Sequence, residues 1–325
     1  MSAPLRLGLI GCGRAAERLW LPAFQAVAEA RLTAVVDPRP ERRALIARDG
    51  GAQRTLERVD ALFADRAVDA AIVATPPATH VAVARLGLEA GVPLLVEKPF
   101  APTVAEAVAL AALARATGTP VMVGFNRRWW PPAERLRQRL AGRGAGTAEL
   151  VFVADATRWF AIAGAPDLLD DLGTHQLDLL RFLFGVEIQT ISASQVEPKE
   201  IRLVARLTDG TIAHCRLAHA GTSEESVRAS AGGRRFHIHA KSSRLTPPDG
   251  PARRGLDLVG RLWRRTAGAR SPLLRSFEHE LRAFVAAVRG GIEPSPGAAD
   301  GVAAARAVAA ARESLAQGGL DVRPS

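Results

Sequence analysis

The sequence predicts an α/β protein that begins with a doubly wound parallel sheet and continues into a second domain rich in β-structure. Its 325 residues are about twice the ~150 typical of one domain. In the first third of the chain, short apolar runs alternate with amphipathic stretches, which is typical of βαβ units. From residue 148 onward, β-rich runs follow one another. We therefore expect one domain over residues 1–122 and a second over residues 123–325.

Each element of the first domain follows from its local pattern. The chain opens with an apolar run at 5–10, passes through glycines and continues as a helical stretch to about Glu29. The remaining strands are expected at 32–36, 70–74 and 94–96, and further helices at 41–48 and 79–90. Strand and helix in alternation predict a parallel sheet with helices on both faces.

The turn after the first strand has the spacing of a dinucleotide fingerprint, with Gly11, Gly13 and Ala16 at its key positions. Gly11 permits the tight turn, Gly13 lets the backbone approach a pyrophosphate, and Ala16 lets helix and strand pack closely. The pyrophosphate would lie at the helix N-terminus, where free N–H groups favour anions. The alternative is that these glycines are ordinary turn residues.

Asp37 ends the second predicted strand, where an acid binds the adenosine ribose diol of NAD and repels the 2′-phosphate of NADP. NAD is therefore the expected cofactor. Arg39, Arg42 and Arg43 follow closely enough to leave NADP possible. Asp37 as a helix N-cap is the structural alternative.

The composition, with 48% hydrophobic and 23% charged residues, is that of a folded globular protein rather than a disordered chain, a collagen or a channel. No apolar stretch approaches the ~20 residues of a membrane helix. Cys12 and Cys215 are the only cysteines and cannot form a disulfide framework. The apolar run at 7–10 breaks at once into glycines, unlike a signal peptide. We expect a cytoplasmic protein with no membrane partner.

The net charge of +10 comes from 43 basic and 33 acidic residues, and only three of the basic residues are lysines. This arginine bias, with no tyrosine, indicates genome-wide base composition more than a nucleic-acid site, because no aromatic residues interleave with the basic ones. The arginine-rich segment at 252–276 fits a solvated surface, with a cleft cover or diphosphate site as the alternative. No nucleic-acid partner is expected.

Five ordered motifs identify a resemblance that runs nearly end to end. They lie at 74–80 (ATPPATH), 96–100 (VEKPF), 123–128 (VGFNRR), 171–178 (DLGTHQLD) and 277–289. Together with the glycine turn, they resemble the glucose-fructose oxidoreductase and inositol dehydrogenase (Gfo/Idh/MocA) family.

The resemblance implies a Rossmann domain followed by an α/β domain whose large, mostly antiparallel sheet joins subunits into a dimer or tetramer. Helices at about 277–316 should return to pack beside the first domain. The β-rich runs agree with this sheet, and Asp209 with Gly210 predicts a hairpin turn. Strands are expected at 148–156, 188–195, 201–207, 211–219 and 235–240.

The resemblance also implies an NAD(P)-dependent dehydrogenase or reductase that interconverts a secondary alcohol and a ketone on a sugar, polyol, nucleotide sugar or related cyclic compound. A non-catalytic, cofactor-binding sensor or regulatory member is the alternative. Glu97 is expected to anchor its loop rather than take protons. The further residues expected at the cofactor are Arg14, Thr75, Pro76, His80, Glu97 and Lys98.

Lys98 is the candidate that handles the substrate proton. It lies at the C-terminal end of a predicted parallel strand, where ligands bind in open α/β sheets. Burial between a cofactor and a second domain would bring its pKa toward neutrality. The alternative, an ordinary surface lysine, is weakened by the rarity of lysine in this chain.

Asp171, His175 and Asp178 have the spacing i, i+4 and i+7, which places them on one stripe of a helix. His175 could exchange a proton with the reacting oxygen, while Asp171 orients His175 or stabilises its charged form. Asp178 could bind a second hydroxyl or anchor the helix. The structural alternative is a helix-terminal charge and a core histidine. With the family resemblance, Lys98, Asp171 and His175 become the expected catalytic residues.

Asn126 and Arg127 follow the last strand of the first domain and are expected to bind substrate, with a linker arginine as the alternative for Arg127. His237 and His239 alternate on one strand, but no third ligand of suitable spacing accompanies them, so no metal site is expected. The segment 165–167 (APD) replaces the family's usual glycines, which puts the substrate's shape in question.

Overall fold

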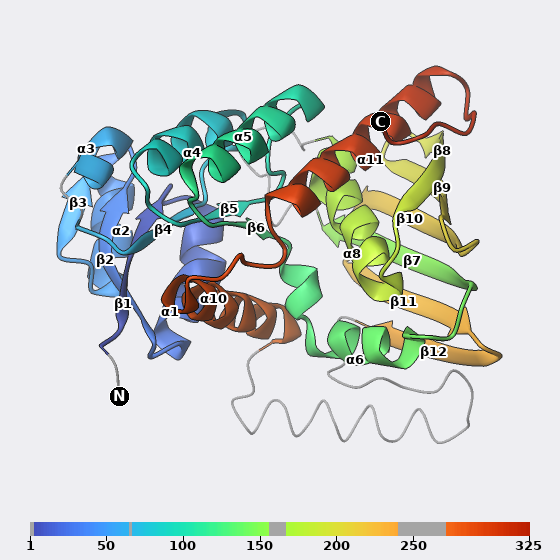
Figure 1. Cartoon of the computed structure of the whole chain (residues 1–325), viewed down its shortest axis with the longest axis horizontal. Helices are drawn as coiled ribbons and strands as arrows, with labels where there is room; N and C mark the ends of the chain where they lie inside the picture. The colour runs from blue at the N-terminus through green and yellow to red at the C-terminus, as the bar shows by residue number, and fades with distance from the viewer. Residues whose placement is uncertain (1–2, 65–66, 156–166, 240–270) are drawn as a thin grey trace.

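The computed structural model describes residues 3–64, 67–155, 167–239 and 271–325 and contains two six-stranded sheets (Figure 1). All pairings in the first sheet are parallel. Its strands are, from one edge to the other, β3 (Arg54–Leu56), β2 (Ala30–Val36), β1 (Leu5–Ile10), β4 (Ala70–Val73), β5 (Leu94–Glu97) and β6 (Val121–Gly124). This is the predicted doubly wound sheet, with its last strand ending two residues beyond the expected boundary at 122.

Helices cover both faces of this sheet, so its strands are buried on both sides, as parallel strands are. One face packs against α1 and α10, and the other against α4 and α5 (Figure 1). The helical elements are η1 (Ala16–Trp20), α1 (Leu21–Ala26), α2 (Pro40–Gly50), α3 (Val59–Ala64), η2 (Pro77–Thr79), α4 (His80–Glu89), α5 (Val104–Thr117) and, from the end of the chain, α10 (Pro272–Gly290).

The second sheet is mixed and mostly antiparallel, which confirms the predicted fold class. Only β7 and β10 pair in parallel, and the other neighbours are antiparallel. In spatial order its strands are β12 (Arg234–His239), β11 (Glu224–Ala231), β7 (Gly146–Asp155), β10 (Ile212–Ala220), β9 (Glu200–Leu207) and β8 (Ile188–Glu197). Gly210, with φ of +89°, forms the turn between β9 and β10 at the predicted position.

One face of the second sheet packs on helices, and the longest of them joins the two domains. α11 (Ala298–Ala316) contacts α5 at one end and β8 at the other (Figure 1). The remaining elements are η3 (Asn126–Trp129), α6 (Pro131–Leu140), η4 (Leu169–Gly173) and α8 (Thr174–Phe184). None of the helices in the described ranges is long and apolar enough to cross a membrane.

Candidate active site

The glycine turn after β1 is closed on one side and open on the other. Gly11 has φ of +92°, and a Cβ there would lie 2.5 Å from the carbonyl oxygen of Ala74. At Gly13, by contrast, a Cβ would meet no described atom within 4 Å. The backbone is therefore held against Ala74, the residue that follows β4, at Gly11 and is open to an incoming group at Gly13. Ala16, fully buried, begins the helix η1, and Arg14 lies half-buried in the helical residues directly before it.

Asp37 lies at the end of β2 as a buried, multiply hydrogen-bonded carboxylate. It accepts hydrogen bonds from the backbone N–H of Cys12 at 2.8 Å and of Arg39 at 3.0 Å, and from the Arg39 guanidinium at 2.9 and 3.1 Å. Burial opposes ionisation, but these donors outweigh it and lower the pKa of Asp37. The N-cap position of α2 is Arg39 and not Asp37.

These residues fit an NAD molecule. The open approach at Gly13 suits a pyrophosphate, and the ionised Asp37 can accept from a ribose diol in place of the Arg39 guanidinium. Arg42 donates to the carbonyl oxygen of Cys12 at 2.8 Å and so fixes the turn from the side of α2. Arg39 lies over Asp37 with its side chain about half exposed (55%), so a cation stands beside the acid.

Two further side chains hold together the loops at the ends of β4 and β5. The two ring nitrogens of His80 lie 2.8 Å from the carbonyl oxygen of Pro99 and 2.9 Å from that of Thr75. Glu97 accepts hydrogen bonds from the Trp20 indole at 2.9 Å and from the backbone N–H of Lys98 at 3.2 Å. His80 and Glu97 are thus engaged with protein groups, whereas Pro76 is exposed.

Lys98 and Asp171 form an ion pair across the two domains. The Lys98 ammonium lies 3.0 Å from the Asp171 carboxylate and donates to the Asp171 backbone carbonyl at 2.8 Å. Each side chain is 17% exposed, so the pair is largely shielded from water but still reachable. The structure brings together these two predicted residues, which lie 73 positions apart in sequence.

A residue that sequence reasoning missed completes this pair. His219, on β10, places its Nε2 3.2 Å from the second oxygen of Asp171. Burial raises the pKa of Asp171, but the Lys98 charge and the hydrogen bonds from His219 and Lys98 lower it to about 2. The available signal was the alternation of β10, which puts His219 on the buried face with Cys215 and Leu217.

His175 is buried near this pair but has another partner. Arg127 lies with its Nη1 3.3 Å from His175 Nε2, and no partner is seen for the buried Nδ1 among the described residues. Burial and the charges of Arg127 and Lys98 lower the pKa of His175 well below 6.5. The imidazole is therefore neutral at physiological pH.

The expected support of His175 by Asp171 is not what the structure shows. Asp171 lies in the π-helical turn η4, whereas His175 lies in the α-helix α8. A π-turn has more residues than the 3.6 of an α-helix, so the i, i+4 stripe expected from the sequence does not carry through it. The two side chains consequently point to different partners.

Arg127 and Asn126 are both engaged within the protein. The Arg127 guanidinium forms a two-point ion pair with Glu225 of β11, at 3.0 and 3.3 Å. Asn126 accepts from Arg127 at 2.8 Å and donates to Ser276 of α10 at 3.0 Å. In this arrangement Asn126 contacts Arg127, and Arg127 in turn contacts His175.

Asp178 is an anchor of its helix. Its carboxylate is 1% exposed and accepts hydrogen bonds from Arg128 at 2.9 and 2.6 Å. Arg128 also bonds Asp300 of α11 at 2.8 Å. Of the two roles left open by the sequence, the structure supports anchoring, and the expectation that Asp178 binds a substrate hydroxyl is corrected.

The segment that departs from the family pattern ends in a helix cap. Residues 165 and 166 lie outside the described ranges, but Asp167 accepts hydrogen bonds from the N–H groups of Leu169 and Asp170 at 2.9 and 3.1 Å. Arg312 of α11 pairs with Asp167 at 3.0 Å and with Asp170 at 2.6 Å. Asp167 thus starts the turn that carries Asp171.

Other expected features lie away from these residues. His237 and His239 sit on β12 with ring centroids 6.4 Å apart, and no group of three metal-ligating side chains was found in the described ranges.

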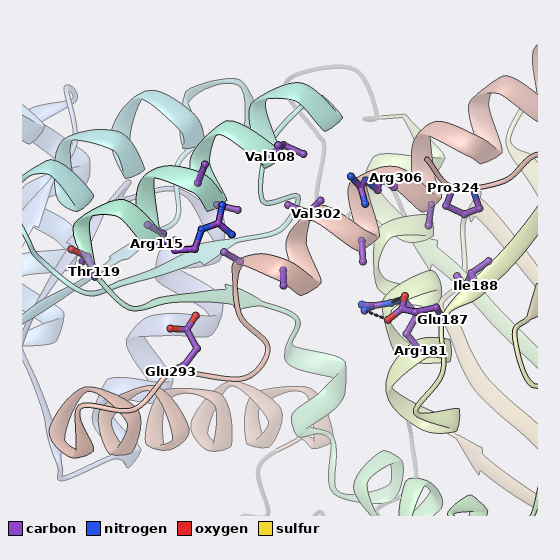
Figure 2. A pocket seen from close by; sticks show the side chains of 18 residues that line it. Val108, Arg115, Thr119, Arg181, Glu187, Ile188, Glu293, Val302, Arg306 and Pro324 are labelled. Atoms are coloured by element: carbon purple, nitrogen blue, oxygen red, sulfur yellow. Dashed lines mark hydrogen bonds and ion pairs between the residues drawn. The ribbon is translucent and has the colours of Figure 1, made fainter.

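A groove of about 890 Å³ lies between α5, α11 and the end of α8 (Figure 2). Arg115, Arg306 and Glu293 line it, and none of the predicted site residues does. The arginine-rich stretch 252–270 lies outside the described residues.

Comparison with known proteins agrees with the Rossmann domain. Residues 5–125 match a family described as "Oxidoreductase family, NAD-binding Rossmann fold". This defines the first domain as the NAD-binding domain of an oxidoreductase family, with NAD as its cofactor. The match covers residues 5–125 of the chain and agrees with the resemblance to the Gfo/Idh/MocA family that the sequence motifs predicted.

Several named relatives share part or all of the chain. A D-apiose dehydrogenase of Paraburkholderia graminis is 32% identical over 54% of this chain, and the aligned part spans about half (49%) of that relative. A UDP-N-acetylglucosamine 3-dehydrogenase of Acidithiobacillus ferrooxidans is 33% identical over 65% of this chain and 66% of its own. An inositol 2-dehydrogenase of Rhizobium meliloti is 26% identical over 96% and 97%.

A solved structure shares the fold over nearly the full length. An oxidoreductase from Agrobacterium radiobacter, in complex with NAD+, L-tartaric acid and magnesium, has a TM-score of 0.81 and 24% sequence identity. The likeness covers 98% of each chain. It supports the two-domain fold alone.

Proposed function

We propose that this protein is an NAD-dependent dehydrogenase that interconverts a secondary alcohol and a ketone on a sugar, a polyol, a nucleotide sugar or a related cyclic compound. The observation that carries the proposal is the Lys98–Asp171 ion pair at 3.0 Å, at the C-terminal end of a parallel strand and beside the neutral His175. Named relatives that are dehydrogenases of apiose, inositol and a nucleotide sugar support the substrate class.

The groups of this site divide the proton chemistry between them. Bound NAD supplies hydride acceptance, so the protein must orient the alcohol and manage its proton. The neutral His175 accepts a proton, and the Lys98 ammonium stabilises negative charge on the reacting oxygen. Asp171 stays ionised and holds Lys98 in place. A homo-oligomer joined through the second sheet and a cytoplasmic location stay predictions from the sequence.

The experiment is a search for turnover with the purified protein. It is mixed with NAD and, in separate reactions, with D-apiose, myo-inositol, scyllo-inositol and UDP-N-acetylglucosamine, and NADH is followed by absorbance. The proposal expects NADH to form with a member of these classes. Tight NADH binding with no turnover across a wider panel of polyols and sugars would instead favour a cofactor-binding sensor.

A further inference from the structure

The Asp171 carboxylate has two partners, Lys98 and His219, and only Lys98 was expected from the sequence. Its first carboxylate oxygen lies 3.0 Å from the Lys98 ammonium, and its second lies 3.2 Å from His219 Nε2. Because the pKa of Asp171 is about 2, the carboxylate carries no proton. His219 must therefore be the donor, with its proton on Nε2.

We propose that His219 is a positioning residue of the active site, which fixes the Asp171 carboxylate so that Asp171 can aim the Lys98 ammonium at the substrate oxygen. This inference rests on the proposed function. His219, on β10, becomes the fourth residue of the site beside Lys98, Asp171 and His175, which the motifs indicate.

The burial of the three groups explains why such a donor matters. The His219 side chain is 4% exposed, and those of Asp171 and Lys98 are 17% exposed. Water can therefore replace a lost donor only poorly, and an unsatisfied buried acceptor costs free energy. The terminal torsion of an aspartate is also broad, so a carboxylate held at one oxygen alone can rotate away from its partner.

The scaffold behind His219 is rigid, as a positioning role requires. β10 is an inner strand paired with β7 on one side and β9 on the other. The backbone N–H of His219 donates to the carbonyl oxygen of Lys199 at 3.0 Å. The His219 imidazole is thus fixed by the second-domain sheet and contacts Asp171, which in turn contacts Lys98 of the first domain.

Substitution tests the role in turnover. His219→Leu removes the donor with similar bulk, and His219→Gln keeps an N–H near the same place. We expect His219→Leu to lower kcat on the order of tenfold or more with NAD affinity unchanged, and His219→Gln to recover most of the loss. His214→Leu, at an exposed position of the same strand, is the matched control. Wild-type kcat in His219→Leu would overturn the proposal, as would equal losses in the Leu and Gln variants at equal thermal stability.

A double-mutant cycle tests whether His219 acts through Asp171. If it does, His219→Leu should cost little once Asp171→Ala is present. The full loss in that background would contradict the inference. Lys98→Ala keeps this result separate from the proposed function, because wild-type turnover in Lys98→Ala would refute the catalytic site itself.

A measurement without substrate tests the hydrogen bond directly. The sample is the full-length protein with ¹⁵N-labelled histidine, which has seven imidazoles. The His219 resonance should be that of a protonated Nε2. It should move in Asp171→Ala and vanish in His219→Leu. A His219 resonance with its proton on Nδ1 alone, or one that Asp171→Ala leaves unchanged, would overturn the assignment.

Discussion

His175 and Lys98 show how neighbouring groups can be kept in different charge states. The imidazole is buried with Arg127 beside it, and both effects disfavour its protonated form. The ammonium has the ionised Asp171 at 3.0 Å. In the proposed function, the unprotonated imidazole is the group that takes a proton, and the ammonium stabilises negative charge on the same substrate oxygen.

Replacement of Arg127 tests this account of His175. In the wild type, the pKa of His175 lies well below 6.5, so the imidazole stays neutral until the pH falls well below that value. Arg127→Met removes a nearby cation, so the pKa should rise toward 6.5 and protonation should begin at higher pH. The measurement is an NMR titration of the histidine ring carbons.

The control for this titration is Arg206→Met, at an exposed arginine of β9. It should leave the His175 titration unchanged. An unchanged His175 pKa in Arg127→Met would show that burial and the Lys98 charge set the charge state without Arg127.

The glycine turn offers a matched pair of substitutions. A Cβ at Gly13 meets no described atom within 4 Å, so Gly13→Ala should fold normally but obstruct the pyrophosphate and weaken NAD binding by about tenfold or more. A Cβ at Gly11 would lie 2.5 Å from a backbone oxygen, so Gly11→Ala should also lose about 1–3 kcal/mol of stability. Calorimetric NAD titration and urea unfolding separate the two effects. Wild-type NAD affinity in Gly13→Ala would contradict this placement of the dinucleotide.

At the scale of elements, the short π-turn η4 carries Asp171 and depends on its cap. Asp167 Oδ1 accepts two backbone N–H groups at the start of this turn. Asp167→Ala should therefore cost about 1 kcal/mol of stability in urea unfolding, whereas Asp167→Asn, which can still cap, should cost less.

The same cap has a functional readout. If it positions Asp171, Asp167→Ala should lower kcat while the dissociation constant for NAD stays unchanged. Equal kcat in Asp167→Ala and the wild type would show that Arg312, which also contacts this turn, suffices to hold it.

The elements show what the sequence could and could not predict. The buried strands of the first sheet have continuous apolar runs, and all four predicted ones are present. β11 (Glu224–Ala231) was missed because its serines, alanines and charges lack the branched and aromatic residues typical of strands. Glu225 lies on this strand, so its ion pair with Arg127, which joins residues 98 positions apart, was missed as well.

At the scale of the whole molecule, a buried ion network ties the two domains together. Arg128 follows the first sheet, Asp178 belongs to α8, and Asp300 begins α11, which reaches back to α5. Local sequence patterns predicted helices close to these residues. They could not predict the ion pairs, because each pair joins segments that lie far apart in the sequence. The family motifs, rather than spacing, indicated that Lys98 and His175 belong to one site.

Loss of Arg128 should destabilise the entire fold. Arg128→Met leaves the Asp178 carboxylate, 1% exposed, without its main partner, and such losses cost about 3–5 kcal/mol. Urea unfolding at neutral pH measures this. The deficit should shrink at acidic pH, where Asp178 of the variant takes up a proton. A variant as stable as the wild type at neutral pH would show that Arg181, 3.8 Å away, compensates fully.

The central claim is that Lys98 and His175 act together on one substrate oxygen beside NAD. The most direct measurement is steady-state NADH formation by the wild type, Lys98→Ala and His175→Ala, with NAD affinity measured on the same samples. Each substitution should lower kcat by roughly 100-fold or more with little change in NAD affinity. Wild-type turnover in either variant would contradict the account.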